Sequence, residues 1–176
     1  MINLEETVIR KLKTIQHILV TVESCTGGLI SHLITNTPGA SEVYWGSFIV
    51  YDNQAKEQLG VSSETLNTHG AVSAKIALQL AEKGLMKAEN ALSHVTPSQS
   101  LIKHKGILCI STTGIAGPQG GSLEKPVGLC FLGLAITGKP TRVEKIQISS
   151  DLVALGRTQI KLVFAQKALE LIRGNV

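Results

Sequence analysis

Short apolar runs rich in β-branched residues alternate with segments of helical periodicity along the chain, and this alternation restricts its fold more than any other feature. The apolar runs occupy residues 18–22, 43–51, 106–111, 127–136 and 142–148. Helical spacing marks the segments 4–16, 29–35, 73–90 and 152–172. Helices between apolar strands favour parallel pairing, whereas the short TGKPT turn between the last two runs indicates a hairpin. The sequence therefore predicts a three-layer α/β/α sandwich with a mixed, mostly parallel central sheet.

The size and composition indicate a single domain over residues 1–176. Hydrophobic side chains make up 43% of the chain and charged ones only 17%. A chain of this length buries roughly 70% of the surface that it exposes when unfolded. We therefore expect a large core that needs no covalent or metal cross-link.

The cysteines and the first residues of the chain indicate in which cellular compartment the protein is expected. Three cysteines, Cys25, Cys109 and Cys130, form an odd set whose spacing fits no zinc signature, so we expect no disulfide scaffold and no metal site. Residues 1–20 mix acids and bases where a signal peptide needs an apolar stretch, and no run reaches about 18 apolar residues. These features predict a cytoplasmic protein without a membrane segment.

The charge distribution bears on the partner. Seventeen Lys and Arg against thirteen Asp and Glu give a net charge of +4. The basic residues are spread singly, without a basic block and without interleaved aromatic residues that could stack on bases. This pattern favours an anionic small-molecule substrate over a nucleic acid.

Two loops of small residues follow predicted strands directly, Ser24–Gly28 and Thr112–Pro126. Because ligands bind beyond the carboxyl ends of strands in open α/β sheets, both loops are expected to face one crevice. Their glycines let backbone N–H groups approach a ligand, and the helix after Gly28 adds a positive dipole end. Neither loop has the pattern of a P-loop or of a dinucleotide fingerprint. The crevice is therefore expected to hold an anion or a developing oxyanion.

Ser24 stands at a strand-to-helix turn between small neighbours, which is a typical place for a nucleophile whose own turn supplies oxyanion donors. Cys25 is a rival nucleophile beside it. Adjacent residues of a turn point in different directions, and a buried structural cysteine is common. Serine is the favoured nucleophile.

A base for Ser24 is harder to find. None of the five histidines has a spacing that suggests a Ser/His/Asp set. Tyr51 ends a predicted strand and Lys56 follows by about one helical turn, so both can reach the edge of the crevice. A partly desolvated lysine has a lowered pKa and can act as a general base, whereas a solvated one is an ordinary surface charge.

Four segments in order carry a family resemblance. They read ESCTGGLIS at 23–31, YDNQAK at 51–56, HGAVS at 69–73 and TGIAGPQGGSLEKPVG at 113–128. With these motifs the chain resembles the CinA C-terminal domain family, the nicotinamide-nucleotide amidohydrolases, in its stand-alone form. The resemblance implies hydrolysis of nicotinamide mononucleotide to nicotinate mononucleotide and ammonia in pyridine-nucleotide salvage. It also implies a CinA-like fold, no cofactor, and a homodimer or higher homo-oligomer.

The resemblance assigns roles by position. Ser24 resembles the nucleophile, Lys56 the general base, Tyr51 a residue that orients or shuttles the proton, and Thr113 the threonine that heads the second loop. Backbone N–H groups of Thr26–Gly28 would hold the oxyanion, and the loop 113–125 with Arg157 would receive the 5′-phosphate. The substrate-binding set is then Cys25, Thr26, Gly27, Gly28, Gly114, Gly117, Gly121, Lys125 and Arg157. Whether Tyr51 or Lys56 accepts the proton stays open.

Two other functions remain possible on the sequence. One is a non-catalytic protein associated with competence and the DNA-damage response, which the family name suggests. The other is an α/β domain that holds a nucleotide without turnover. A continuous basic stripe would favour the first, and the sequence has none.

Aromatic residues are few and clustered, since four of six lie between residues 44 and 51. Phe48 is expected to be core packing. Tyr44 and Trp45 either pack in the core or an interface, or lie near the crevice, where an aromatic face would attract a pyridinium ring by roughly 0.5–2 kcal/mol.

Overall fold

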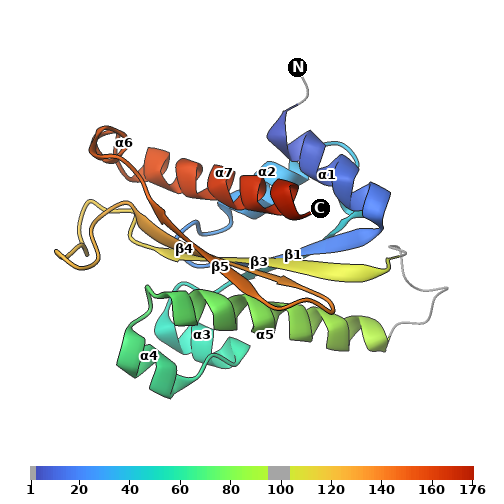
Figure 1. Ribbon diagram of the computed structural model, residues 1–176, viewed down its shortest axis with the longest axis horizontal. Helices are drawn as coiled ribbons and strands as arrows, with labels where there is room; N and C mark the ends of the chain where they lie inside the picture. The colour runs from blue at the N-terminus through green and yellow to red at the C-terminus, as the bar shows by residue number, and fades with distance from the viewer. Residues whose placement is uncertain (1–2, 95–103) are drawn as a thin grey trace.

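The computed structural model describes residues 3–94 and 104–176, which form a five-stranded sheet between two layers of helices (Figure 1). The strands are β1 (His17–Glu23), β2 (Tyr44–Ile49), β3 (Gly106–Gly114), β4 (Leu129–Ile136) and β5 (Arg142–Gln147). The first helices are α1 (Leu4–Ile15), α2 (Leu29–Thr35), the short 3₁₀ helix η1 (Ala40–Glu42) and α3 (Asn53–Leu59). The later helices are α4 (Ser63–His69), α5 (Ala74–Ser93), α6 (Ser150–Ala154) and α7 (Arg157–Asn175).

The sheet has the order β2-β1-β3-β4-β5. β1 pairs in parallel with both β2 and β3, while β3–β4 and β4–β5 are antiparallel. The predicted α/β/α fold with a mixed sheet is confirmed, and so is the hairpin of the last two strands. Because β1 and β3 run parallel, their carboxyl ends meet at one edge of the sheet, where both glycine-containing loops begin.

Each face of the sheet is covered by helices, with α1, α2 and α7 on one side and α3, α4 and α5 on the other (Figure 1). Two separate apolar cores result, one on each face. This double cover explains why β1 and β3 are buried along almost their whole length instead of alternating between buried and exposed residues. No helix in the described ranges is long and apolar enough to cross a membrane.

The C-terminal segment differs from the prediction of one helix over 152–172. It forms two helices, because Gly156 has a φ of +86° and interrupts the helical hydrogen bonding between α6 and α7. The interruption makes Arg157 the first residue of α7. This break matters for the site, since it directs Arg157 toward the carboxyl edge of the sheet.

Other helix and strand boundaries also differ from those predicted from the sequence. The segment 91–106 has a mixture of polar residues, Pro97 and two histidines, which predicts an exposed irregular connection. Its start is helical instead, because α5 continues to Ser93, and residues 95–103 lie outside the described part. His17, expected at the end of a helix, is the first residue of β1. Strand β3 continues to Gly114, so Thr113 belongs to the strand rather than to the loop.

The aromatic cluster lies on the edge strand β2. Trp45 and Phe48 contact each other with ring centroids 5.9 Å apart and pack on the core beneath α5. The Tyr44 hydroxyl hydrogen-bonds with Thr21 and Ser31. These three rings serve packing and a buried hydrogen-bond network.

Candidate active site

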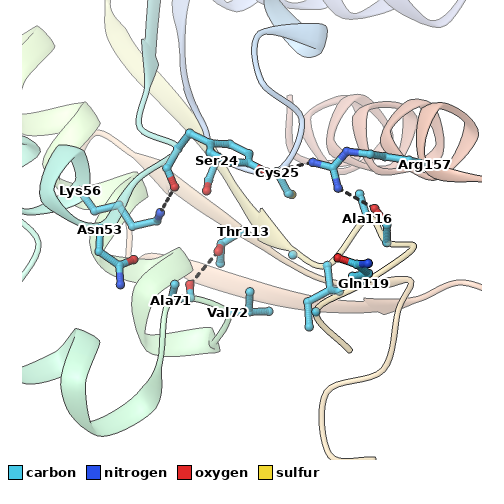
Figure 2. A pocket seen from close by; sticks show the side chains of 15 residues that line it. Ser24, Cys25, Asn53, Lys56, Ala71, Val72, Thr113, Ala116, Gln119 and Arg157 are labelled. Atoms are coloured by element: carbon cyan, nitrogen blue, oxygen red, sulfur yellow. Dashed lines mark hydrogen bonds between the residues drawn. The ribbon is translucent and has the colours of Figure 1, made fainter. Parts of the chain in front are cut away.

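A pocket of about 270 Å³ lies at the carboxyl ends of β1 and β3, between α3 and the start of α7 (Figure 2). Its size is near the lower limit of ligand pockets, which typically hold about 300–1,000 Å³. The lining residues are Ser24, Cys25, Tyr51, Asn53, Lys56, Ala71, Val72, Thr113, Gly114, Ile115, Ala116, Gly117, Gln119, Gly120 and Arg157. Figure 2 shows Lys56 and Arg157 entering from opposite sides, with Thr113 between them.

The turn that carries Ser24 is held by a buried carboxylate, that of Glu23. This side chain is fully buried and accepts five hydrogen bonds of 3.1 Å or less. The donors are the backbone N–H groups of Gly28, Ile30 and Ser31 and the hydroxyls of Thr26 and Ser31. Glu23 thereby occupies the N-terminus of α2, where a carboxylate is favoured by unpaired N–H groups and the helix dipole.

Two expectations about this turn are therefore wrong. The anion at the positive end of α2 is the chain's own Glu23 rather than a ligand. The N–H of Gly28 cannot hold a substrate oxyanion, because it donates to Glu23 at 2.9 Å. Thr26 and Gly27 also lie outside the pocket lining, whereas Cys25 is part of it.

Lys56 is the most unusual side chain of the site because it is only 1% exposed. Its Nζ donates to the backbone oxygen of Tyr51 at 2.8 Å and lies 3.5 Å from that of Asp52. Neither ion pair found in the described part of the chain involves this lysine. Desolvation lowers the pKa of Lys56, and the nearby Asp52 charge offsets only part of that effect. A lysine in this setting is suited to lose its proton.

Arg157 forms the opposite side of the pocket. Its guanidinium donates to the Gly117 carbonyl at 2.7 Å and to the Tyr51 hydroxyl at 2.9 Å. Tyr51 is 63% exposed, so its ring lies at the mouth of the pocket. Tyr51 thus touches Lys56 through its carbonyl and Arg157 through its phenol, which is not the phenol-to-lysine contact that a proton shuttle would use.

Thr113 stands at the floor, near the end of β3. Its hydroxyl donates to the Ala71 carbonyl at 2.7 Å and is almost fully buried. Because the hydroxyl proton is committed to Ala71, only the oxygen lone pairs of Thr113 are available to a ligand.

The structure brings together all four predicted catalytic residues and four of the predicted substrate-binding ones. The latter are Cys25, Gly114, Gly117 and Arg157. The predicted substrate-binding residues outside the lining are Thr26, Gly27, Gly28, Gly121 and Lys125. The ammonium of Lys125 donates instead to the His69 carbonyl at 2.8 Å, which fastens the loop to α4.

Sequence reasoning missed three side chains. Glu23 was visible as a lone acid that ends an apolar strand directly before a turn and a helix. Asn53 and Gln119 line the pocket, and nothing in their sequence context marked them. Histidine is absent from the lining, and within residues 3–94 and 104–176 no three His, Cys, Asp or Glu side chains gather as a metal site.

Comparisons with known proteins agree on one family. A family model described as the CinA C-terminal domain matches residues 1–96 and 98–176. A protein of Caldanaerobacter subterraneus is 44% identical over 149 residues, which are 84% of this chain and 32% of that protein. A CinA-like protein of Kosmotoga olearia is 40% identical over 172 residues, which are 97% of this chain and 36% of that protein. The chain spans about a third of the length of these relatives.

A solved structure extends the agreement to three dimensions. The competence/damage inducible protein CihA of Agrobacterium tumefaciens superposes with a TM-score of 0.79 at 35% identity, over 96% of this chain and 92% of that one. The match thus covers nearly the whole chain. Its motifs, its fold and its relatives together show that this chain belongs to the CinA C-terminal domain family.

Proposed function

We propose that the protein is an amidohydrolase that converts nicotinamide mononucleotide to nicotinate mononucleotide and ammonia, with Ser24 as nucleophile and Lys56 as base. The observation that carries the proposal is that a buried lysine, which forms no ion pair with any described residue, opens onto the same pocket as Ser24. A lysine held this way is unfavourable as a mere structural cation, because burial penalises its charged form.

The first step is proton transfer. Neutral Lys56 has two N–H groups, which the carbonyls of Tyr51 and Asp52 can accept, and one lone pair, which in the proposed step receives the proton of the Ser24 hydroxyl in the same pocket. The lone pair takes the hydroxyl proton while the Ser24 oxygen attacks the carboxamide carbon. The products of this step are a lysine ammonium and a tetrahedral oxyanion.

The second step is loss of ammonia. The oxyanion accepts from the backbone N–H of Cys25, the residue next to the nucleophile, since the N–H of Gly28 is committed to Glu23. The Lys56 ammonium gives its proton to the departing amine, so ammonia leaves and an ester remains on Ser24. Water, deprotonated by the regenerated neutral lysine, then attacks the ester carbon. The ester bond to Ser24 breaks, the Lys56 ammonium returns its proton to the Ser24 oxygen, and the nicotinate product is released.

The opposite side of the pocket suits the phosphate. The Arg157 guanidinium contacts neutral oxygens, the Gly117 carbonyl and the Tyr51 hydroxyl, rather than carboxylates. Its guanidinium can therefore exchange the Tyr51 hydroxyl for a phosphate oxygen and gain a charge-assisted hydrogen bond. Lys125 is not needed for this role, because it is engaged by α4.

The proposal is tested by ammonia release from nicotinamide mononucleotide with wild type, Ser24→Ala and Lys56→Ala. Ser41→Ala and Lys87→Ala are matched controls, since both residues are exposed and outside the pocket. We expect release by wild type and both controls, and at least about a 10²-fold loss in the two site variants. Absence of ammonia release by the folded wild type overturns the proposal. Binding of the nucleotide without release would favour a nucleotide-binding domain without turnover.

A further inference from the structure

We propose that Cys25 and Cys130 are an oxidisable dithiol, which hydrogen peroxide converts to a disulfide behind the Ser24 turn. The two Sγ atoms lie 4.0 Å apart, and both cysteines are buried. They are far apart in the chain, one in the turn after β1 and the other in β4. The proposed catalytic steps use neither thiol.

The fold leaves room for the two thiols to meet. β3 lies between β1 and β4, and its last residue, Gly114, pairs with Cys130. A Cβ added at Gly114 would stand 2.6 Å from the Leu129 carbonyl oxygen and 3.0 Å from the Cβ of Cys130, so no side chain fits at Gly114 beside Cys130. Glycine at this place keeps the space across β3 open.

The two cysteines differ in access. Cys25 lines the pocket, whereas Cys130 is fully buried and does not. A small oxidant that enters the pocket therefore meets Cys25 first. Burial also raises the pKa of Cys130, which fits the resolving partner better than the first nucleophile.

The chemistry balances with hydrogen peroxide as the oxidant. The Cys25 thiolate attacks one peroxide oxygen, so a sulfenic acid forms and hydroxide leaves, which becomes water with the thiol proton. The Cys130 sulfur then attacks the Cys25 sulfur, and its proton goes to the departing hydroxide as a second water. Two thiols and one peroxide thus give one disulfide and two waters.

The disulfide would disturb the nucleophile. The sulfur atoms must approach from 4.0 Å to about 2.0 Å, and Cys25 is covalently next to Ser24. A displacement of about 1 Å in an active site can cost about 10²-fold in rate. This consequence for activity rests on the proposed function, but formation of the disulfide does not.

The test treats the folded protein with hydrogen peroxide, blocks free thiols with an alkylating agent under denaturing conditions, and maps peptides by mass spectrometry. We expect a Cys25–Cys130 cross-linked peptide in wild type and in Cys109→Ser, and none in Cys130→Ser. Cys109 is the matched control, because it is equally buried but packs beside Gly84 in the other core. Absence of the cross-linked peptide in wild type, or oxidation of Cys25 without it, overturns the proposal.

Activity is the second readout. Ammonia release by wild type should fall at least about tenfold on oxidation and return with dithiothreitol. Before oxidation, Cys130→Ser should release ammonia at the wild-type rate. An active protein that carries the disulfide and keeps its full rate contradicts the inferred effect on Ser24. A protein that releases no ammonia before oxidation contradicts the proposed function instead, while the peptide map still decides the disulfide.

Discussion

The two cations of the pocket stand in opposite environments. Lys56 is 1% exposed and its Nζ donates to the backbone oxygens of Tyr51 and Asp52, so burial favours its neutral form. Arg157 begins a helix at the surface and is held by one carbonyl and one phenol, while its charge remains accessible to solvent. The difference indicates that one side of the pocket is built to move a proton and the other to hold an anion.

Removing the lysine should have the largest effect. Lys56→Met keeps the length of the side chain but not the base, so kcat should fall at least about 10²-fold with little change in KM. The same change removes a buried amine whose charged form burial disfavours, so the melting temperature should rise by a few degrees, since about 1 kcal/mol shifts it by roughly 2–4 °C in a chain of this size. Steady-state kinetics and calorimetry measure both.

Lys56→Arg sharpens this experiment, because arginine keeps the positive charge but cannot lose its proton at working pH. It should be as inactive as Lys56→Met. Activity near the wild-type level in either variant would mean that Lys56 is not the base.

Lys56 and Arg157 can act on one bound substrate only if the Ser24 turn between them stays fixed. Glu23→Gln replaces one carboxylate oxygen with an NH₂ group, which leaves at least one buried N–H or hydroxyl donor without an acceptor at a cost of about 1–3 kcal/mol. We expect a loss of stability in denaturant unfolding and a drop in kcat of about tenfold or more, because Ser24 is displaced. A stable variant with full kcat would show that the carboxylate does not position the turn.

The arginine side should affect binding rather than rate. Arg157→Ala removes a charge-assisted hydrogen bond, so KM for the nucleotide should rise about tenfold or more while kcat stays within about twofold. Arg142→Ala, an exposed substitution on β5, is the matched control. A large fall in kcat with unchanged KM would indicate instead that Arg157 takes part in the catalytic step.

The pH dependence should give the smallest but most specific signal. The pKa of Lys56 is lower in the folded than in the unfolded chain, so the unfolded chain binds more protons between the two values. The free energy of unfolding should therefore gain a contribution from this residue as pH rises through that window. Denaturant titrations of wild type and Lys56→Met at several pH values should differ in slope in that direction, and equal slopes would contradict the shift.

Sequence reasoning located the pocket because the site follows a simple rule, that ligands bind beyond the carboxyl ends of strands. Ser24 and Thr113 are tied to β1 and β3, whose apolar runs were clear. Lys56 follows β2 at a spacing that a short helix fixes. The proximity of these residues could therefore be predicted without any knowledge of how the side chains pack.

The features of the site that were not predicted from the sequence depend on tertiary contacts. The sequence left the N-terminus of α2 open for a ligand, whereas packing buries Glu23 there. Gly156 lay inside a helical pattern, and its left-handed conformation could only be seen in the chain path. Lys125 lies in a long loop without periodicity, so its contact with the His69 carbonyl had no signal in the sequence.

The central claim, that Ser24 is the nucleophile, is tested most directly by trapping the ester. Wild-type protein is mixed with nicotinamide mononucleotide, quenched with acid within one turnover, and digested for mass spectrometry. We predict an acyl group from the nucleotide on Ser24 and none in Ser24→Ala. An acyl group on Cys25, or ammonia release by Ser24→Ala at the wild-type rate, would contradict the account.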